Sequence, residues 1–396
     1  MFSFMLSLLL VCSTCEFKDI QSALKKAREG DRIVVKSGTY KGGIVIDKKV
    51  ELVGEGKPVI DGEGKLQVIT VKADSVKIEG FIIKNSGMSY SEDIAGLKVI
   101  NSRDCVIKNN KFLNNFFAIY LERVQGCLIE GNSIVGFAKS EGSSGNGIHA
   151  WNSEKVIIRN NYVKGHRDGI YFEFVKDSLI ENNRSEYNLR YGLHFMFSND
   201  DTYRKNYFYK NGAGVAVMYS KNIRMEENTF TKNEGQANYG LLLKDIYDSV
   251  LYGNRFINNT HGVYLEGCSR TEFKGNLFEN NGWAVRIYAN SEDNLFIKNS
   301  FLGNAFDVST NTLSYFRNTF ESNYYDQYEG YDINRDGYGD IPYRPVSFVA
   351  VLFERYPLSL LLYGSFFAHI MDAVERYIPL LNPQSLLDSK PLVRRP

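Results

Sequence analysis

Hydrophobic and polar positions repeat along most of this chain with a period close to 22 residues. From about Leu97 onward, most repeats have an Asn with an apolar residue three positions before it and an aromatic or aliphatic residue two positions after it. A second Asn often follows five positions later, and a Gly then opens an alternating segment such as GIHAW, GIYFE or GLHFM. The repeating Asn are Asn110, Asn132, Asn161, Asn183, Asn206, Asn228, Asn254, Asn276, Asn299 and Asn318.

Three short strands per repeat account for this pattern and predict an all-β solenoid, a right-handed single-stranded parallel β-helix. In such a fold each coil pairs with the next at about 4.8 Å, so that like residues stack on like. Inward apolar residues then fill the core, and Asn side chains at the corners hydrogen-bond up the stack. A leucine-rich repeat has a similar period, but its LxxLxL pattern is absent here.

Composition strengthens the ladder interpretation. The chain has 396 residues and 36 Asn, but only one of its 8 Pro, Pro58, precedes residue 342. Pro would remove hydrogen-bond donors from a ladder of strands, so its scarcity is expected. A formal net charge of +1 gives no electrostatic reason to expect nucleic acid as a partner, and 43% hydrophobic residues argue against disorder.

The amino-terminal residues differ from the repeat. The apolar run Phe4–Val11 is too short to span a bilayer and predicts a signal peptide over residues 1–15, with cleavage or a lipid anchor at Cys15 left open. Phe17–Arg28 has apolar residues at helical spacing and predicts a helix that caps the solenoid. We therefore expect the β-helix with its cap over residues 16–341.

The carboxy-terminal residues, 342–396, form a separate predicted segment. After Pro345 the sequence is strongly apolar and punctuated by Pro, with helical spacing near Ser347–Glu354 and Leu358–Tyr377. A lone soluble domain would hardly leave such apolar helices exposed. They predict a helical tail that docks on the end of the β-helix or on a membrane-embedded protein.

Two Cys residues occupy equivalent places in adjacent repeats. Cys105 and Cys127 each lie five residues before a repeating Asn, so they should stack in neighbouring coils. A disulfide is geometrically possible at that spacing. Two inward Cys that serve as small core residues explain the same placement.

The Gly-led strand of each coil carries an unusual set of outward residues. Its inward positions are apolar, so alternation predicts that the intervening side chains face solvent. Thioether and imidazole groups together favour Cu(I) over hard cations, which predicts a copper-handling face. An apolar protein-docking patch with adaptable Met side chains explains the same residues, and the two roles can coexist. The candidate copper ligands are His149, Glu173, His194, Met196 and Met218.

Other Met and His residues receive ordinary structural interpretations. Met225 falls in an inward stack and is expected in the core, while His166 and His261 fall at corners and are expected to be solvated.

A second metal site is predicted between residues 332 and 340. Oxygen ligands alternate there, and Gly337 allows the sharp turn of a calcium loop. The bidentate Glu expected at loop position 12 is absent, so a turn rich in Asp and Gly that closes the β-helix is the alternative. The candidate calcium ligands are Asp332, Asn334, Asp336, Tyr338 and Asp340.

Enzymatic activity is the second functional hypothesis, because β-helices often serve polysaccharide lyases, epimerases and glycosidases. Such sites need clustered acids and bases in a groove. The outward row offers only Glu173 among Met, His and Trp, which argues for a protein without catalytic residues. The remaining candidates for such chemistry are Arg167, Asp168, Arg190, Asp200 and Asp201.

Several longer motifs resemble the NosD family of nitrous oxide reductase maturation proteins. They are RDGIYFEFV (167–175), YGLHFMFSND (191–200), GAGVAVMYS (212–220) and the ending DGYGDIPYRPVSF…ERYP…LL (336–362). Generic β-helix repeats do not share HFMFS or VAVMYS. The resemblance covers essentially the whole mature chain.

This resemblance implies a periplasmic β-helix that partners the permease and ATPase subunits of an ABC transporter and is membrane-associated through that complex. The family supports delivery of copper or sulfur to the copper–sulfide centre of nitrous oxide reductase. A copper chaperone and the reductase are then the implied docking partners. The family's carboxy-terminal helices dock on the permease, and its Met/His strand surface implies a copper-handling role for His194, Met196 and Met218.

Overall fold

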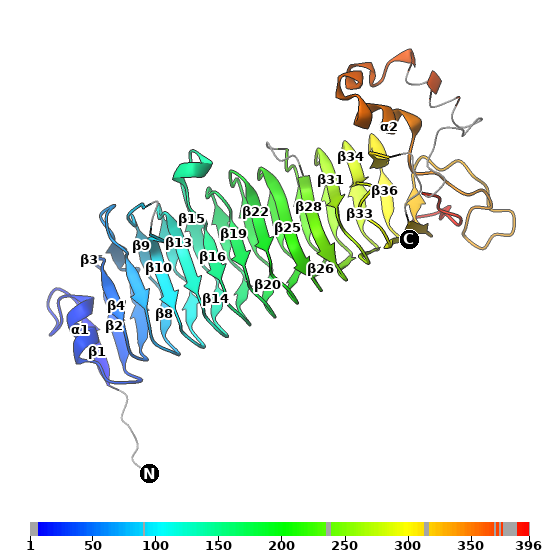
Figure 1. Ribbon diagram of the computed structural model, residues 1–396. Coiled ribbons are helices and arrows are strands. Elements are labelled where there is room, and N and C mark those ends of the chain that lie inside the picture. The colour runs from blue at the N-terminus through cyan, green and yellow to red at the C-terminus, as the bar shows by residue number, and fades with distance from the viewer. Residues whose placement is uncertain are drawn as a thin grey trace, which may run out of the picture. The chain divides into compact units, whose positions relative to one another are not determined.

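Most strands of the molecule have only three residues, and usually one side chain of the three is buried. The computed structural model describes residues 7–89, 92–234, 239–312, 317–367, 370, 371, 374 and 386–395. The chain divides into a first unit, residues 1–207, and a second unit, residues 208–396. In each unit the strands wind into three parallel sheets, here called A, B and C, as the expected right-handed parallel β-helix (Figure 1).

The first unit begins with the predicted cap. Helix α1 (Ile20–Lys26) starts at Asp19, whose carboxylate accepts a hydrogen bond from the Ser22 N–H at 2.8 Å. Its buried face, which includes Leu24, contacts β1, β2 and β4 of the first coils. Residues 8–11, inside the predicted signal peptide, form β1 and pair with β2. The signal-peptide boundary itself stays a prediction.

The strands of the first unit follow the predicted three-per-coil order. Sheet A contains β1 (Leu8–Val11), β2 (Arg32–Val35), β5 (Glu51–Gly54), β8 (Lys77–Glu79), β11 (Val106–Lys108), β14 (Leu128–Glu130), β17 (Ile157–Arg159), β20 (Leu179–Glu181) and β23 (Thr202–Arg204). Sheet B contains β3 (Thr39–Lys41), β6 (Val59–Asp61), β9 (Ile82–Lys84), β12 (Lys111–Leu113), β15 (Ser133–Val135), β18 (Tyr162–Lys164) and β21 (Arg184–Glu186). Sheet C contains β4 (Ile44–Ile46), β7 (Ile69–Val71), β10 (Ala95–Ile100), β13 (Phe117–Glu122), β16 (Ile148–Trp151), β19 (Ile170–Glu173) and β22 (Tyr191–Met196). One short 3-10 helix, η1 (Glu141–Ser143), interrupts the loop before β16.

The second unit repeats this arrangement. Its sheet A contains β26 (Arg224–Glu226), β29 (Val250–Tyr252), β32 (Glu272–Lys274), β35 (Asn294–Ile297) and β38 (Asn318–Glu321). Its sheet B contains β27 (Thr229–Thr231), β30 (Arg255–Ile257), β33 (Leu277–Glu279), β36 (Ser300–Leu302) and β39 (Tyr324–Tyr325), and β24 (Tyr207–Tyr209) spans the boundary in sequence. Its sheet C contains β25 (Ala213–Lys221), β28 (Tyr239–Tyr247), β31 (His261–Glu266), β34 (Trp283–Ile287) and β37 (Phe306–Thr310).

Like stacks on like in the core, as the period predicts. In the first unit the central residues of sheet A are Ile107, Ile129, Ile158 and Ile180, all buried. In the second unit the aromatic rings of sheet B lie parallel, with centroids about 5 Å apart from Phe230 to Tyr325. Met225 is buried in the core, which confirms its expected inward position.

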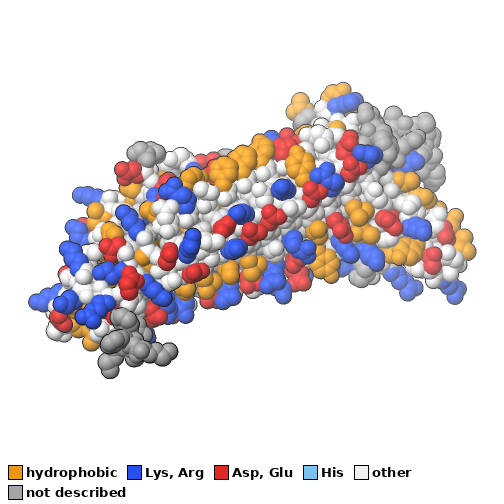
Figure 2. Space-filling view, turned by 60° about the horizontal axis from the view of Figure 1, so that its bottom comes forward, with side chains coloured by type: hydrophobic (Ala, Val, Ile, Leu, Met, Phe, Trp, Pro, Cys, Tyr) orange, Lys and Arg blue, Asp and Glu red, His pale blue; other side chains and the backbone are white. Residues whose placement is uncertain are grey.

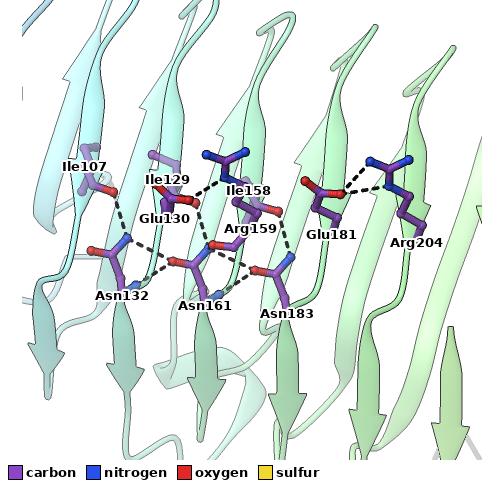
Figure 3. Close-up of polar contacts among 10 residues, drawn as sticks. All are labelled: Ile107, Ile129, Glu130, Asn132, Ile158, Arg159, Asn161, Glu181, Asn183 and Arg204. Carbon is purple, nitrogen blue, oxygen red and sulfur yellow. Dashed lines mark hydrogen bonds and ion pairs between the residues drawn. The ribbon is translucent and has the colours of Figure 1, made fainter.

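From Asn110 onward an Asn ladder closes the same corner of successive coils, and three of its rungs are drawn in Figure 3. Asn132 Nδ2 donates to the Ile107 carbonyl at 2.9 Å and to Asn161 Oδ1 at 3.0 Å. Asn161 Oδ1 also accepts the backbone N–H of Asn132 at 2.9 Å, and Asn161 Nδ2 donates to Asn183 Oδ1 at 3.0 Å. Each side chain thus satisfies buried backbone groups that the turning chain cannot pair for itself.

In the last coils the Asn ladder passes through a different residue from the one that the sequence predicted. Asn299 donates to Asn323, not to Asn318, through its backbone N–H and its Nδ2, both at 2.9 Å. Asn318 instead accepts from Asn294 at a different corner. Extra residues between β35 and β38 shift the spacing, and the short gap of 19 residues before Asn318 was the sequence sign of this change.

The carboxy-terminal segment ends on the β-helix of the second unit. Asp388 is fully buried, and its Oδ2 accepts both the backbone N–H and the Nδ2 of Asn323 at 3.0 Å. Asp388 therefore takes the place of the next Asn in the ladder. Helix α2 (Phe348–Arg355) confirms the first predicted helical run, and the 3-10 helix η2 (Pro357–Leu362) begins the second, several of whose later residues lie outside the described part of the chain.

The open question about Cys105 and Cys127 is answered within the first unit. Cys105 and Cys127 form a disulfide between adjacent coils. A second disulfide, Cys12–Cys15, closes the turn after β1 and was not predicted. Cys268, in the second unit, is a buried free thiol.

Some charged side chains on the coils form ion pairs across neighbouring strands. Arg159 and Glu130 lie 2.6 Å apart, and Arg204 and Glu181 lie 2.9 Å apart (Figure 3). Figure 2 shows acidic and basic side chains intermixed on the face it draws. This mixing agrees with the near-zero net charge.

Removing one rung tests the ladder. We expect Asn161→Ala to lower the free energy of unfolding by about 3 kcal/mol or more, because it leaves the Ile129 carbonyl and the Asn132 donors buried without partners. The exposed neighbour Asn160, whose φ is +57°, provides the control, since Asn160→Gly keeps the turn and every ladder bond. Urea unfolding followed by circular dichroism measures both, and equal losses would contradict the role of the ladder.

Candidate functional site

Two outward rows of side chains run along sheet C of the first unit. Strand register places Tyr120, His149, Tyr171 and His194 in one row. The same register places Glu122, Trp151, Glu173 and Met196 in the other. Four of the five predicted copper ligands therefore share one sheet face, and Met218 lies on β25 of the second unit.

The predicted solvent exposure of the histidines is wrong. His149 is 8% exposed and His194 is 4% exposed. Aromatic rings from neighbouring coils cover them: Tyr171 lies between the two, with its centroid 4.7 Å from His149 and 4.8 Å from His194. Alternation sends these side chains outward, but large neighbours in the same row then exclude water from them.

This stacking separates the two imidazoles. They lie two coils apart, or roughly 10 Å at the spacing of parallel strands. His149 Nδ1 is 3.2 Å from Asn146 Nδ2, which comes from the loop before β16. The structure therefore brings His194 and Met196 together on one strand but leaves His149 in a neighbourhood of its own.

A buried ion pair lies against His194. Asp168 is fully buried and accepts hydrogen bonds from Arg190 Nε at 2.9 Å and from the backbone N–H of Tyr191 at 3.2 Å. His194 Nδ1 lies 3.6 Å from Asp168 Oδ2. Neither ring nitrogen of His194 has a hydrogen-bond partner among the described residues. An imidazole buried without partners is an unusual feature, because most buried polar groups are hydrogen-bonded.

Burial controls the protonation of this cluster. It lowers the pKa of His194, and this effect exceeds the opposing attraction of the Asp168 carboxylate. Burial would raise the pKa of Asp168, but His194 and Arg190 outweigh it and hold that pKa at about 2. At neutral pH, His194 is therefore an uncharged imidazole beside a charged carboxylate, the form in which imidazole binds metals.

Met196 lies at the rim of the buried row. Its side chain is half-buried, and its Sδ accepts a hydrogen bond from the Tyr171 hydroxyl at 3.5 Å. Glu173, on the adjacent strand, is paired with Met196 in the register and is also half-buried. Met218 is half-buried in the second unit, where it is paired with Lys244. These thioethers are thus reachable from solvent, whereas His194 is not.

His166 and His261 are both buried, so the expectation that these corner histidines are solvated is wrong. His166 is 2% exposed and packs against the Gly136 and Gly147 backbones. His261 is buried in the second unit, where it stacks on Trp283 with a centroid distance of 4.8 Å. The tight coils leave too little room at these corners for water to reach the rings.

In the predicted calcium loop, the side-chain oxygens accept hydrogen bonds from backbone N–H groups of the same loop. Asp332 Oδ2 accepts the Gly337 N–H at 2.9 Å, Asp336 Oδ1 accepts the Tyr338 N–H at 2.9 Å, and Asp340 Oδ2 accepts the Ile333 N–H at 2.7 Å. Asn334 Oδ1 accepts the Asp336 N–H at 3.0 Å. Within the described ranges no three His, Cys, Asp or Glu side chains gather as a metal site. Calcium here stays a prediction without structural support.

An anchoring contact for the tail was missed by sequence reasoning. Helix α2 packs Val349, Ala350 and Phe353 against Phe306 of β37. Glu354, from the same helix, accepts a hydrogen bond from Arg286 Nε at 2.9 Å. Arg286 also lies 3.3 Å from His261 Nε2. The partners are far apart in sequence, so no local pattern could have revealed this contact.

Beyond this anchor the tail exposes apolar side chains. Leu358 is 85% exposed, Leu361 is 88% exposed and Phe366 is 80% exposed. Within the described parts of the chain, every helix falls short of the length and apolar character that crossing a bilayer requires.

The buried histidines predict acid sensitivity at mild pH. Burial lowers the pKa of His166 to about 4, from an ordinary value of 6.5. The unfolded chain therefore takes up a proton that the folded protein excludes, so stability is full above pH 6.5 and falls as the pH drops toward 4. We expect this histidine to account for a loss of about 2 kcal/mol in the free energy of unfolding between pH 8 and pH 5.

The comparison uses His166→Leu, which has no titrating group at that position. Urea unfolding at both pH values should show a smaller loss for this variant than for the parent chain. An unchanged loss would show that His166 is not the titrating group.

Comparison with known proteins agrees with the sequence motifs. A family model described as periplasmic copper-binding protein (NosD) matches residues 136–330. A probable ABC transporter binding protein NosD from Pseudomonas aeruginosa is 29% identical over 407 residues, which cover 98% of this chain and 94% of the relative. A protein of the same name from Stutzerimonas stutzeri is 27% identical, covering 91% of this chain and 86% of the relative.

Solved structures share the fold at low identity. The family 28 exopolygalacturonase of Yersinia enterocolitica has a TM-score of 0.62 at 12% identity, covering 82% of this chain and 78% of its own. The A-module of the mannuronan C-5 epimerase AlgE4 of Azotobacter vinelandii has a TM-score of 0.53 at 17% identity, covering 78% and 92%. These two show the β-helix fold alone. The family model, the relatives and the motifs of sheet C agree on one identity: the chain belongs to the NosD family.

Proposed function

We propose that this protein is a periplasmic accessory protein of an ABC transporter, membrane-associated through the permease and ATPase subunits. In this role it supports copper and sulfur delivery and assembly of the copper–sulfide centre of nitrous oxide reductase. The description of the family as copper-binding and the names of the relatives as transporter binding proteins support this assignment.

One observation carries the copper part of the proposal. His194 and Met196 project from the same side of β22, the first as a neutral imidazole without a hydrogen-bond partner and the second as a thioether at the rim. Imidazole nitrogen and thioether sulfur are suitable donors for Cu(I). Met218 adds a second half-buried thioether on the second unit.

The other candidates have weaker support. Glu173 lies beside Met196 in the register and could add a carboxylate. Tyr171 separates His149 from His194, so His149 fits a separate or supporting position.

The small set of donor groups favours transfer of copper over its storage. Few ligands and a rim position suit weak, exchangeable binding better than a closed site does. In this mechanism the ATP cycle of the transporter moves the β-helix. The β-helix then presents the Met/His face, which comprises His194, Met196 and Met218, to a copper chaperone and afterwards to the reductase. The protein performs no bond chemistry of its own.

An exported polysaccharide lyase, epimerase or glycosidase is the alternative. Of its candidate acids, Asp168 and Asp201 are fully buried, and Asp168 is paired with Arg190. These carboxylates are therefore poorly placed to act on a polymer in a surface groove. Cleavage or epimerisation of a uronic-acid polymer by the purified protein would overturn the accessory role.

Removing the two thioethers tests the copper role. We expect the double variant Met196→Leu and Met218→Leu to keep its unfolding midpoint, because Leu has a similar volume and both side chains are half-buried. Its affinity for Cu(I), measured by competition with a coloured chelator, should fall at least tenfold. Reductase matured with this variant should lack its copper–sulfide cluster.

The exposed Met88 provides the matched control. Met88→Leu removes a thioether outside the Met/His face and should leave Cu(I) affinity and cluster loading unchanged. Normal cluster loading in the double variant would rule out the role of Met196 and Met218.

The exposed tail supplies the second test, for docking on the permease. We expect Leu358→Ser, Leu361→Ser and Phe366→Ser together to abolish co-purification with the permease, because these side chains form the apolar surface beyond α2. The unfolding midpoint of the isolated protein should not change. Exposed Phe137, in the first unit, provides a control as Phe137→Ser. Continued co-purification of the triple variant would contradict docking through the tail.

A further inference from the structure

One corner of the first unit holds the backbone in the left-handed conformation in five coils. The corner residues are Asn101, Arg123, Asn152, Phe174 and Phe197, with φ between 48° and 54°. The first four donate their backbone N–H to the carbonyl of the residue before the next corner, for example Phe174 to Met196 at 3.1 Å. They are therefore structurally equivalent positions.

Aromatic residues are costly choices at such positions. Asn tolerates the left-handed region well, but a bulky side chain there is a genuine outlier. Asn101 and Asn152 show that the same corner accepts Asn in this protein. Strained residues that persist beside tolerant alternatives direct attention to function.

The two rings lie at the surface. Phe174 is 48% exposed and Phe197 is 40% exposed. Their planes are within 10° of parallel and their centroids are 5.2 Å apart. Each ring thus covers one face of the other, and neither is needed to fill the core beneath it.

A groove of about 690 Å³ runs beside these rings. Its charged lining residues are Arg103, Arg123, Lys176 and Glu154. Lys176 and Glu154 pair with each other at 2.8 Å, and Arg123 is held by Glu122 and by Asn101 Oδ1. Arg103 makes no ion pair with any residue that the structure describes, so the groove keeps an excess of positive charge.

We propose that this groove binds an extended segment of a partner protein that carries acidic residues and at least one apolar anchor. Parallel bridges link the groove positions from Arg103 to Asn199 across five coils. Four coil spacings amount to roughly 19 Å, the length of about six residues in an extended chain. The carboxylates meet Arg103, and the anchor packs against Phe174 and Phe197.

Ring geometry favours a peptide over a saccharide. Sugars stack on open aromatic faces, and here each ring has at most one such face left, because its inner face is covered by the other ring. The exposed parts of the two rings suit contact with an apolar side chain of a peptide, including an aromatic one in an offset-stacked or edge-to-face arrangement.

The groove borders Met196, since Phe197 is the next residue. An occupant would therefore lie close to the Met/His face. The proposal goes beyond copper handling, and peptide binding can be measured without metal, so its failure and that of the copper role are distinguishable.

The test uses the full chain and an array of seven-residue peptides that combine Glu or Asp with Leu, Phe or Met. Fluorescence anisotropy should detect salt-sensitive binding of acidic peptides, and at least tenfold weaker binding of the same peptides with Lys in place of each acid. Binding should fall at least tenfold in the double variant Phe174→Asn and Phe197→Asn and in Arg103→Glu.

The double variant Phe174→Asn and Phe197→Asn also distinguishes a peptide-binding role of the two rings from a role in stability. Because Asn relieves the left-handed strain, its melting temperature should rise or stay unchanged while its peptide affinity falls. Tyr252→Asn, at an exposed aromatic residue on sheet A of the second unit, is the matched control and should keep both properties. A lower melting temperature in the double variant, no binding by any acidic peptide, or preferential binding of a galacturonate trisaccharide would overturn the proposal.

Discussion

The fold depends on the hydrogen bonds of the Asn ladder. A chain that turns sharply at every corner leaves buried carbonyls and N–H groups without partners, and unpaired groups of this kind are costly. Each ladder Asn supplies a donor and an acceptor at once, as Asn132, Asn161 and Asn183 show in Figure 3. This requirement sets the register of adjacent coils, and that register determines which outward side chains become neighbours.

The candidate copper site follows from the register. Stacking Tyr120, His149, Tyr171 and His194 in one row excludes water from the imidazoles, although each points away from the core. Burial then keeps His194 neutral, while Asp168 beside it stays charged through its contact with Arg190. Met196, two residues further along the strand, reaches the rim. A half-buried thioether beside a buried imidazole is thus a product of stacking, because neither residue alone dictates it.

The same coil geometry offers places where stability and surface function compete. A corner that accepts Asn at Asn101 and Asn152 carries Phe174 and Phe197 instead, at a cost to the backbone. At the end of the second unit, the last ladder position is filled by Asp388 from a distant part of the chain. Helix α2 is held nearby through Arg286 and Glu354, which leaves the apolar residues beyond it exposed. In both units the ladder supplies a rigid frame, and the residues that depart from its pattern form the candidate binding surfaces.

The sequence by itself determined the period, the parallel β-helix, the inward core stacks and the capping helix, because these depend on spacing along the chain. It also placed His194 and Met196 on one strand face. It failed on the exposure of His149 and His194, since alternation gives the direction of a side chain but not the size of its neighbours in other coils. The ladder register at Asn323, the Asp388 cap and the Arg286–Glu354 contact join residues far apart in sequence. Only the tertiary structure could decide them, because their partners are set by how the coils stack.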